Sequence, residues 1–216
     1  PTTPQFYNFV NGVPTQLTYR ITPRTVAVTV DRDLGLFAQD KWTVGRWTLA
    51  GGVRYDHFKN SFPPQAIAPT TLAPNLNVSF DRIENYSLHD ITPKMGVTYD
   101  LFGNGKTALK VTLNKYLEGL GTTGALSDQP NPINRLNTLT TRPWTDSDTD
   151  FVPDCDLLNY ATNGECGALV NAAIFGTVQP GTTYDPDVLA GWGKRFYNWE
   201  FTAGVQHELV PRLSLD

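Results

Sequence analysis

The stretch that decides the fold is RWTLAGGVRYDHF, which runs from Arg46 to Phe58. From Leu49 onward its residues alternate in character. One set consists of Leu49, Gly51, Val53 and Tyr55, and the other of Ala50, Gly52, Arg54 and Asp56. Successive side chains of a strand point to opposite faces, so this pattern predicts a strand with one apolar and one polar face. In a soluble β-protein the apolar face lies inside, whereas in a membrane barrel it contacts lipid.

Composition favours strands and loops over helices. The 216 residues are 12 % aromatic and only 18 % charged, with 18 Gly and 16 Pro. The net charge of -4 provides no basic field, which argues against a nucleic-acid partner. No apolar run reaches the ~18–20 residues of a membrane-spanning helix, although alternating strands cross a bilayer in ~9–11 residues.

Strand-like runs come in pairs joined by short turns, such as Val44-Gly45-Arg46 and Gly103-Asn104-Gly105. Other connections are long, at about residues 11–31, 59–90 and 120–195. Soluble domains rarely hold such long structureless loops, whereas outer-membrane barrels combine short periplasmic turns with long external loops. The chain is therefore predicted to be all-β, with about seven antiparallel strands of a larger transmembrane barrel. Because it opens without Met and closes within a strand-like run, we expect a fragment of a longer protein.

Two sets of side chains are assigned on this prediction. The polar set, expected to face a wet lumen, is Arg54, Lys94, Lys110 and Glu200. The aromatic set, expected to form two girdles at the membrane surfaces, is Trp42, Trp47, Tyr55, Phe58, Tyr99, Phe102, Tyr116, Tyr197 and Trp199. From Trp47 to Phe58, eleven residue steps of ~3.4 Å tilted by ~40° span roughly 28 Å, close to the ~25 Å apolar band of a barrel.

Two stretches of the sequence resemble a known protein family. DLGLFAQDKWTVGRWTLAGGVRYDHF, from Asp33 to Phe58, resembles paired barrel strands of TonB-dependent outer-membrane receptors, and DITPKMGVTYDLFGNGKTALKVTLNKY, from Asp90 to Tyr116, resembles the next hairpin. In detail, the sequence of these strands most resembles Oar-like receptors, which carry a carboxypeptidase-regulatory-like domain. The resemblance extends from about Phe6 to Asp216 and implies a 22-stranded barrel in the bacterial outer membrane. It also implies an N-terminal plug, absent from this sequence, through which the inner-membrane TonB complex drives import.

The most chemically suggestive stretch is WTDSDTDFVPDCDLLNYATNGECG, which begins at Trp144. Its alternating carboxylates, which suit the hard-oxygen preference of Ca²⁺, are Asp146, Asp148, Asp150, Asp154 and Asp156. The stretch loosely resembles extracellular calcium repeats but has Phe151 where a Gly makes the sharp turn of an EF-hand loop. Cys155 and Cys166 are expected to form a disulfide, with two unpaired thiols as the alternative. A solvated acidic loop closed by that disulfide is the alternative to a Ca²⁺ site.

Three functions remain open at this stage, and none is enzymatic, since the sequence contains no catalytic motif. The first is uptake of an organic nutrient, such as an oligosaccharide, a peptide or a metal chelate, with outer-membrane lipid as surroundings. The second is a surface-adhesion barrel without transport, and the third is a soluble carbohydrate-binding β-sandwich. Loop aromatics that either stack on a ligand or pack the loop itself are Trp144, Tyr160, Tyr184 and Trp192.

Overall fold

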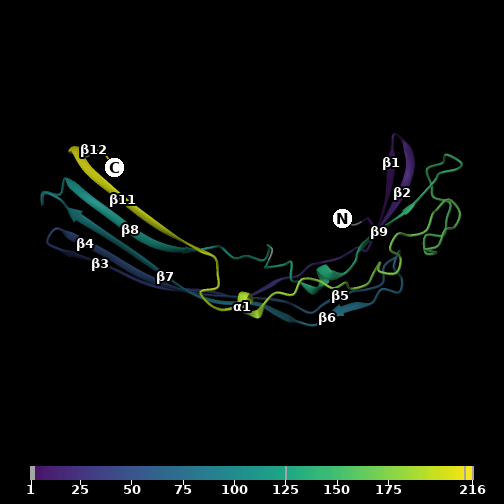
Figure 1. Cartoon of the computed structure of the whole chain (residues 1–216), viewed down its shortest axis with the longest axis horizontal. Coiled ribbons are helices and arrows are strands. Elements are labelled where there is room, and N and C mark those ends of the chain that lie inside the picture. The colour runs from purple at the N-terminus through teal and green to yellow at the C-terminus, as the bar shows by residue number, and fades with distance from the viewer. Residues whose placement is uncertain (1–2, 125, 212, 216) are drawn as a thin grey trace. The chain divides into compact units, whose positions relative to one another are not determined.

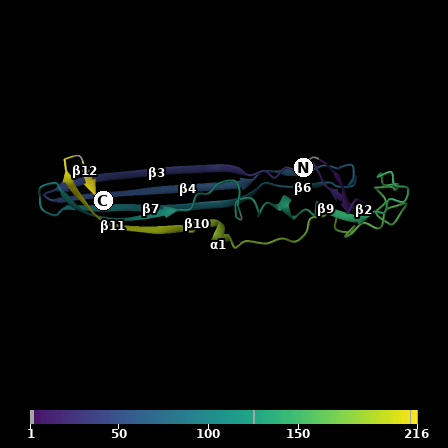
Figure 2. The same ribbon diagram turned by 90° about the horizontal axis from the view of Figure 1, so that it is seen from above.

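The structure is a computed structural model that describes residues 3–124, 126–211 and 213–215 (Figures 1 and 2). The chain divides into two compact units. The long-strand unit comprises Thr29–Ser61, Glu84–Thr122 and Tyr184–Asp216, and the loop unit comprises Pro1–Val28, Phe62–Ile83 and Thr123–Thr183. Each unit is described by itself. No α-helix in the described part of the chain is long and apolar enough to cross a membrane.

The long-strand unit is built on one antiparallel sheet. Its described strands follow the order β12-β11-β8-β7-β4-β3, with β10 added in parallel to β7. Figure 2 shows the long strands running side by side. Their bounds are β3 Thr29–Val44, β4 Trp47–Phe62, β7 Ile83–Asp100, β8 Thr107–Leu117, β10 Ala190–Trp192, β11 Tyr197–Val210 and β12 Leu213–Leu215. The short helix α1, Pro186–Leu189, precedes β10.

Two tight turns link these strands because their glycines adopt left-handed backbone angles. Gly45, between β3 and β4, has φ +60°. Between β7 and β8, Gly103 and Gly105 have φ of +74° and +75°. The backbone N–H groups of both glycines donate to the Asp100 carboxylate at 2.9 Å. The turn Gly103-Asn104-Gly105 is thus a hairpin loop held by Asp100 at the end of the preceding strand.

The register sorts the side chains of the sheet into two faces, because residues directly opposite in an antiparallel pair share a face. Val53 pairs with Ala38, Val111 pairs with both Val97 and Ala203, and Phe201 pairs with Leu113. These apolar side chains occupy a face that is open to the surroundings, with Val53 49 % exposed and Phe201 67 % exposed. We call this the outward face and the opposite one the inward face.

The loop unit has a different construction. Its described strands form a β1-β2-β9 sheet and a separate β5-β6 pair. Their bounds are β1 Gln5–Val10, β2 Val13–Arg20, β5 Gln65–Ile67, β6 Val78–Phe80 and β9 Leu139–Pro143, with a 3-10 helix at Pro132–Arg135. A buried core joins segments far apart in sequence, including Leu17, Leu72, Ile133, Trp144 and Leu169. Hydrophobic burial of this kind is how a soluble domain is stabilised.

The predicted long connections are therefore more ordered than the sequence analysis assumed. Strand β2 forms inside the predicted connection 11–31, and β9 forms inside 120–195. The connection 59–90 is shorter than expected, since β4 continues to Phe62 and β7 begins at Ile83. These segments keep their backbone groups paired because they fold against one another as a unit with its own core.

Candidate functional site

The predicted lumen residues share one face of the sheet. Lys94 and Glu200 both pair with Asn114 of β8, and Lys110 of the same strand faces the same way. Arg54 lies on this inward face as well, because it alternates with Val53 on β4. Phe37, directly opposite Arg54, also faces inward despite its apolar character. The inward face therefore combines most of the sheet's charge with a few apolar side chains.

Short-range contacts hold the inward side chains in place. The Arg54 guanidinium forms an ion pair with Asp56 at 2.8 Å. The Lys94 ammonium lies 3.9 Å from the ring centre of Tyr116, a cation–π arrangement. A groove of about 530 Å³ runs over this face, and its polar lining includes Gln39, Lys41, Lys94, Thr112 and Asn114. The inward face thus offers hydrogen-bond donors and cations to whatever passes along it.

A buried ion pair lies on the inward face near the end distant from the short turns. Asp90 of β7 is completely buried and pairs with Arg195 at 3.3 Å. The same guanidinium lies over the ring of Phe58, with 5.8 Å between its central carbon and the ring centre. The segment that leads from β10 to β11 is thereby held against the inward face of β4 and β7.

The register corrects part of the predicted aromatic girdles. Phe58 pairs with Asp33 and Tyr116 with Asn198, so both face inward, opposite to the apolar side chains. Phe102 lies in the turn after β7, outside the strand ladder. The outward face keeps the remaining members, which are Trp42, Trp47, Tyr55, Tyr99, Tyr197 and Trp199. The predicted position of Phe58 rested only on its distance from Trp47 along the strand. The alternation of side chains along β4 places Phe58 on the inward face.

With Phe58 removed, the distance between girdles is measured by outward residues alone. Trp47 to Tyr55 spans eight steps, roughly 27 Å along the strand and roughly 21 Å after a ~40° tilt. The rings of Trp47 and Tyr99 are in tilted contact, with 4.4 Å between their centres, at the short-turn end. Tyr55 donates or accepts a 2.8 Å hydrogen bond with His89 Nδ1 at the other end. The girdle assignment of these residues stays a prediction.

The acidic stretch brings only part of its predicted ligand set together. Among the described residues, Asp146, Asp148 and Glu165 place carboxylate oxygens within 4.8 Å of one another. Glu165 was missed by the sequence analysis, because it is brought back to the aspartates by tertiary contacts, namely the Cys155–Cys166 disulfide and the backbone hydrogen bond from Thr145 N–H to the Glu165 carbonyl. Asp150 and Asp156 instead accept backbone N–H bonds two residues ahead, from Val152 and Leu158. Asp154 contributes its backbone N–H, which donates to the Glu165 carboxylate at 3.2 Å.

Alternating aspartates therefore have a structural use that needs no metal. A carboxylate that accepts the N–H two residues on forms an Asx turn, and such turns recur along this loop. Backbone N–H groups of Ser147 and Asp154 hold the pKa of the Glu165 carboxyl below its usual value. Desolvation among neighbouring carboxylates raises the pKa of Asp148. The Ca²⁺ site stays a prediction.

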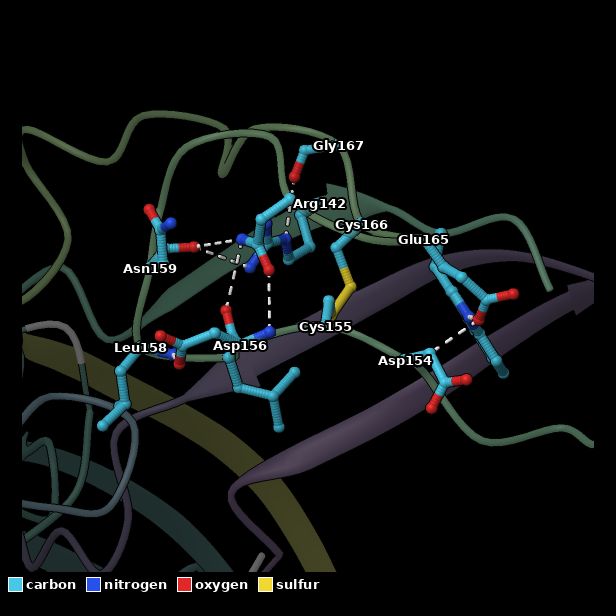
Figure 3. The surroundings of a disulfide bond; sticks show 12 residues. Arg142, Asp154, Cys155, Asp156, Leu158, Asn159, Glu165, Cys166 and Gly167 are labelled. Atoms are coloured by element: carbon cyan, nitrogen blue, oxygen red, sulfur yellow. Dashed lines mark hydrogen bonds between the residues drawn. A yellow bond between two sulfur atoms is a disulfide. The ribbon is translucent and has the colours of Figure 1, made fainter. Parts of the chain in front are cut away.

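The disulfide loop is anchored by a buried arginine (Figure 3). Arg142 of β9 is completely buried, and its guanidinium donates to the backbone carbonyls of Gly167, Asn159 and Ala161 at 2.8–3.1 Å. It also donates to the Tyr19 hydroxyl at 3.2 Å. Three carbonyls from the loop thus converge on one cation beside the Cys155–Cys166 bond. The Arg142 guanidinium therefore fixes the loop backbone through carbonyl groups, and within the described residues its hydrogen bonds go to these carbonyls and to the Tyr19 hydroxyl.

Two of the four loop aromatics named from the sequence pack inside the loop unit. Trp144 is 1 % exposed, and the Tyr160 hydroxyl donates to the Leu72 carbonyl at 2.8 Å. Tyr184 is half-buried, and Trp192 belongs to the outward face of the long-strand unit. For Trp144 and Tyr160, packing therefore replaces the open ligand contact.

The exposed aromatic surface of the loop unit is formed by residues that the sequence analysis did not select. Tyr7 and Phe9 alternate on the edge strand β1 and are each 45 % exposed. Their rings contact the buried Trp144 at 5.4 and 6.0 Å, and Phe151 lies 6.1 Å from Phe9. The alternation of residues in QFYNFV, Gln5–Val10, could have indicated that Tyr7 and Phe9 share one face of a strand. We call Tyr7, Phe9 and Phe151 the aromatic patch.

Comparison with known families decides the identity of the chain. Residues 2–116, more than half of the sequence, match the family described as TonB dependent receptor-like, beta-barrel. The chain belongs to this TonB-dependent receptor family. No curated protein and no solved structure was found to match it.

Membership of this family explains the polarity of the sheet. TonB-dependent receptors are outer-membrane proteins of bacteria, and the family consists of receptors and transporters rather than enzymes. The outward face of the long-strand unit is therefore the lipid side of a barrel wall, and the short turns lie at its periplasmic end. The resemblance to the Oar-like subgroup stays a prediction.

Proposed function

We propose that this chain forms part of the wall and outer surface of a transporter that imports an organic nutrient across the outer membrane. The observation that carries the proposal is the polarity of the long-strand unit. Apolar side chains such as Val53 and Phe201 are open to the surroundings, while Arg54 and Lys94 lie on the opposite face. Lipid outside and water inside is the arrangement that a passage for polar solutes requires.

The loop unit supports the same proposal by offering a place to capture a ligand. In its aromatic patch, Tyr7 and Phe9 contact the buried Trp144, and Phe151 contacts Phe9. Exposed rings with a fixed orientation stack on sugar rings or on peptide side chains at low entropic cost. The carboxylates of Asp146 and Glu165 lie close to the patch, since Phe151 N–H donates to Asp146 and Trp144 Nε1 donates to Glu165. Ligand hydroxyl or ammonium groups would find acceptors there.

Import by this class of protein needs an energy source outside the chain. We infer that the inner-membrane TonB complex, from which the family takes its name, supplies it, and that a plug domain passes it on. The inward face, with its cationic side chains Lys41, Arg54 and Lys94, is the surface that such a plug or a passing solute would contact. The nutrient is an oligosaccharide, a peptide or a metal chelate.

The test is uptake by cells that carry or lack the full-length gene. The probes are radiolabelled starch oligosaccharides, a radiolabelled casein digest and ferric citrate. We expect one probe to accumulate only in cells with the gene and to stop accumulating when TonB is deleted, while surface binding persists. Binding without accumulation in cells with TonB would instead show an adhesion or surface-binding barrel.

A pair of variants locates the capture surface. Phe9→Ala combined with Phe151→Ala removes two rings of the aromatic patch, and we expect half-maximal uptake to need about tenfold more substrate. Phe102→Ala is the control, because Phe102 is more exposed than either ring but lies at the short turn after β7. Equal effects of the two substitutions would count against capture at the patch.

A further inference from the structure

Strand β1 of the loop unit has one side that no other described strand covers. In the sheet order β1-β2-β9 it is the outermost strand, and among the described residues it pairs with β2 alone (Figure 1). An outermost strand presents unpaired backbone N–H and C=O groups, which form a template for a further strand. We call the side of β1 away from β2 the open edge.

The pairing with β2 shows which residues direct their backbone groups to the open edge. Arg20 N–H donates to the Pro4 carbonyl at 2.7 Å, so these two opposite residues form a hydrogen-bonded pair. Hydrogen-bonded and non-hydrogen-bonded pairs alternate along an antiparallel ladder, and the Tyr7–Leu17 pair, three positions further along β1, is therefore of the non-hydrogen-bonded kind. The N–H and C=O groups of Tyr7 consequently point away from β2. They are available to a strand added at the open edge.

The sequence of β1 lacks the features that usually protect such an edge. Its residues Gln5–Val10, QFYNFV, include no charged side chain and no proline. The irregular position in the β1–β2 ladder leaves β1 itself regular, because the unmatched residue, Thr15, belongs to β2. Natural proteins block outermost strands with Lys, Pro or bulges, so an uncharged and regular strand is suited to pair with a partner.

Two aromatic side chains of β1 lie on the same face of the strand. The rings of Tyr7 and Phe9 both contact Trp144, with 5.4 and 6.0 Å between ring centres, and each of the two side chains is 45 % exposed. Side chains of a strand added at the open edge would lie directly beside these rings. Cross-strand pairs of aromatic and β-branched residues are favourable. This face of β1 therefore prefers a partner with apolar residues at alternate positions.

Carboxylates lie close to the Phe9 end of β1. The ring of Phe151 lies 6.1 Å from that of Phe9, and the Phe151 N–H donates to Asp146 at 3.1 Å. Asp146, Asp148 and Glu165 place carboxylate oxygens within 4.8 Å of one another. The sequence of the loop unit contains no Lys. A partner that carries a cationic side chain beyond its apolar residues therefore complements the charge of this surface.

We propose that the open edge of β1 captures a peptide in extended conformation by adding it to the sheet as a further strand. The inference rests on the proposed function and names its substrate class, a cationic peptide with apolar residues at alternate positions. Backbone groups such as those of Tyr7 hold the peptide, the rings of Tyr7 and Phe9 select its apolar residues, and the carboxylates select its charge. In strand addition, main-chain hydrogen bonds provide affinity and alternate side chains provide specificity.

The experiment measures peptide binding by the full-length receptor purified in detergent. The probe is the peptide Lys-Thr-Val-Thr-Val-Thr-Lys with blocked ends and a fluorescent label, and fluorescence anisotropy gives its affinity. One analogue has Glu in place of both Lys, and another has methyl groups on the backbone nitrogens of two adjacent central residues. The methylated analogue should bind about tenfold more weakly, because one of its methylated nitrogens faces β1 whichever side of the peptide is paired. The Glu analogue should also bind about tenfold more weakly.

Two substitutions at one position separate the backbone contact from the ring contact. Tyr7→Ala removes the ring and keeps the N–H, whereas Tyr7→Pro removes both, and an outermost strand tolerates proline where the N–H faces outward. We expect Tyr7→Pro to weaken binding about fivefold more than Tyr7→Ala does. Asp148→Asn should weaken binding of the Lys peptide about twofold. Its matched control is Asp81→Asn, which changes an exposed carboxylate just after β6, outside the β1-β2-β9 sheet, and should leave binding unchanged.

Equal binding of the peptide and its methylated analogue would overturn the proposal, and this comparison needs no variant to fold. A receptor dimer in light scattering that Tyr7→Pro dissociates would assign the open edge to a second copy of the chain and would also overturn it. Cellular uptake of an oligosaccharide or ferric citrate, without peptide binding, would remove this inference and leave the proposed function standing. Peptide binding without accumulation of any probe in cells would remove the transport function and keep the open edge as a peptide site.

Discussion

The loop unit and the long-strand unit treat apolar side chains in opposite ways. In the loop unit, Leu17 and Trp144 are at most 1 % exposed and lie in a core with Ile133. In the long-strand unit, Val53 and Phe201 are about half or more exposed on a continuous face. The two units therefore place their apolar side chains as expected for different surroundings, which are water for the loop unit and lipid for the long-strand unit.

The difference shows what an exposed residue means in this family. On a soluble monomer, contiguous apolar patches larger than a few hundred square ångströms are rare and favour aggregation. In lipid the same face costs nothing, and the costly groups are charges at mid-depth. Exposure alone therefore does not separate surface from core, and the alternation of polar and apolar residues along each strand does.

The largest expected effect separates the two kinds of tryptophan. Trp144→Ala should destabilise the loop unit by about 3–5 kcal/mol, because it empties the centre of a packed core. Trp192→Ala removes a ring that is 61 % exposed and should leave the loop unit intact. Limited proteolysis of the full receptor in vesicles measures this. Equal cleavage of the two variants would mean that the loop unit does not have a soluble-type core.

The second prediction concerns charge on the two faces of β8. Val111→Lys places an ammonium on the outward face and should cost ~2–4 kcal/mol in a lipid bilayer. The neighbouring Thr112→Lys faces inward, opposite Gly96 and Thr202, and should cost much less. Urea titration of the receptor folded in vesicles gives both values. The comparison fails when Thr112→Lys is the more damaging substitution.

The third prediction is confined to the loop unit. Cys155 and Cys166 are separated by 11 positions, so their bond closes a short loop of the unfolded chain. Replacing both with Ser should lower the loop unit's free energy of unfolding by ~2–3 kcal/mol and leave the long-strand unit unchanged. Proteolysis at increasing urea concentration resolves the two units. A change in the strands instead would show that the units are not independent.

The smallest expected effect is a dependence on pH. The pKa of Glu165 is lowered by the backbone N–H groups of Ser147 and Asp154, so the folded loop prefers its carboxylate form. This stabilisation is present above the ordinary pKa of 4.5 and is lost as the pH falls through the lower folded value. Asp148, whose pKa is raised, works in the opposite direction. Glu165→Gln should flatten the acid limb of loop-unit stability, and an unchanged acid limb would contradict the assignment.

Much of the long-strand unit was predictable, because period-two alternation is a local property of a sequence. The hairpins around Gly45 and Gly103 follow from it, as does the common face of Arg54, Lys94, Lys110 and Glu200, while their contact with a wet lumen stays a prediction. The prediction assigned Phe58 and Tyr116 to the lipid-facing girdles from their distance to a turn. The face of a strand residue is set instead by whether it occupies an odd or an even position along the strand. The position of an aromatic residue near a strand end does not indicate whether its side chain lies on the inward or the outward face.

The loop unit was harder to predict, since its core joins residues that no local pattern connects. Leu17, Leu72 and Leu169 pack together across more than a hundred positions of chain. For the same reason Glu165 was not recognised beside Asp146 and Asp148, and Arg142 was not recognised as the anchor of the disulfide loop. These contacts depend on tertiary folding, which alternation and motif spacing do not encode.

The most direct test of the account is the solvent met by alternate residues of β8. Single nitroxide labels at Leu109, Val111 and Leu113, and at Lys110, Thr112 and Asn114, would be compared in the full receptor in a bilayer. We predict that the first set collides mainly with oxygen dissolved in lipid and the second with a water-soluble nickel chelate, in strict alternation. The reverse phase, or equal access of the chelate to both sets, would contradict a lipid-facing apolar surface.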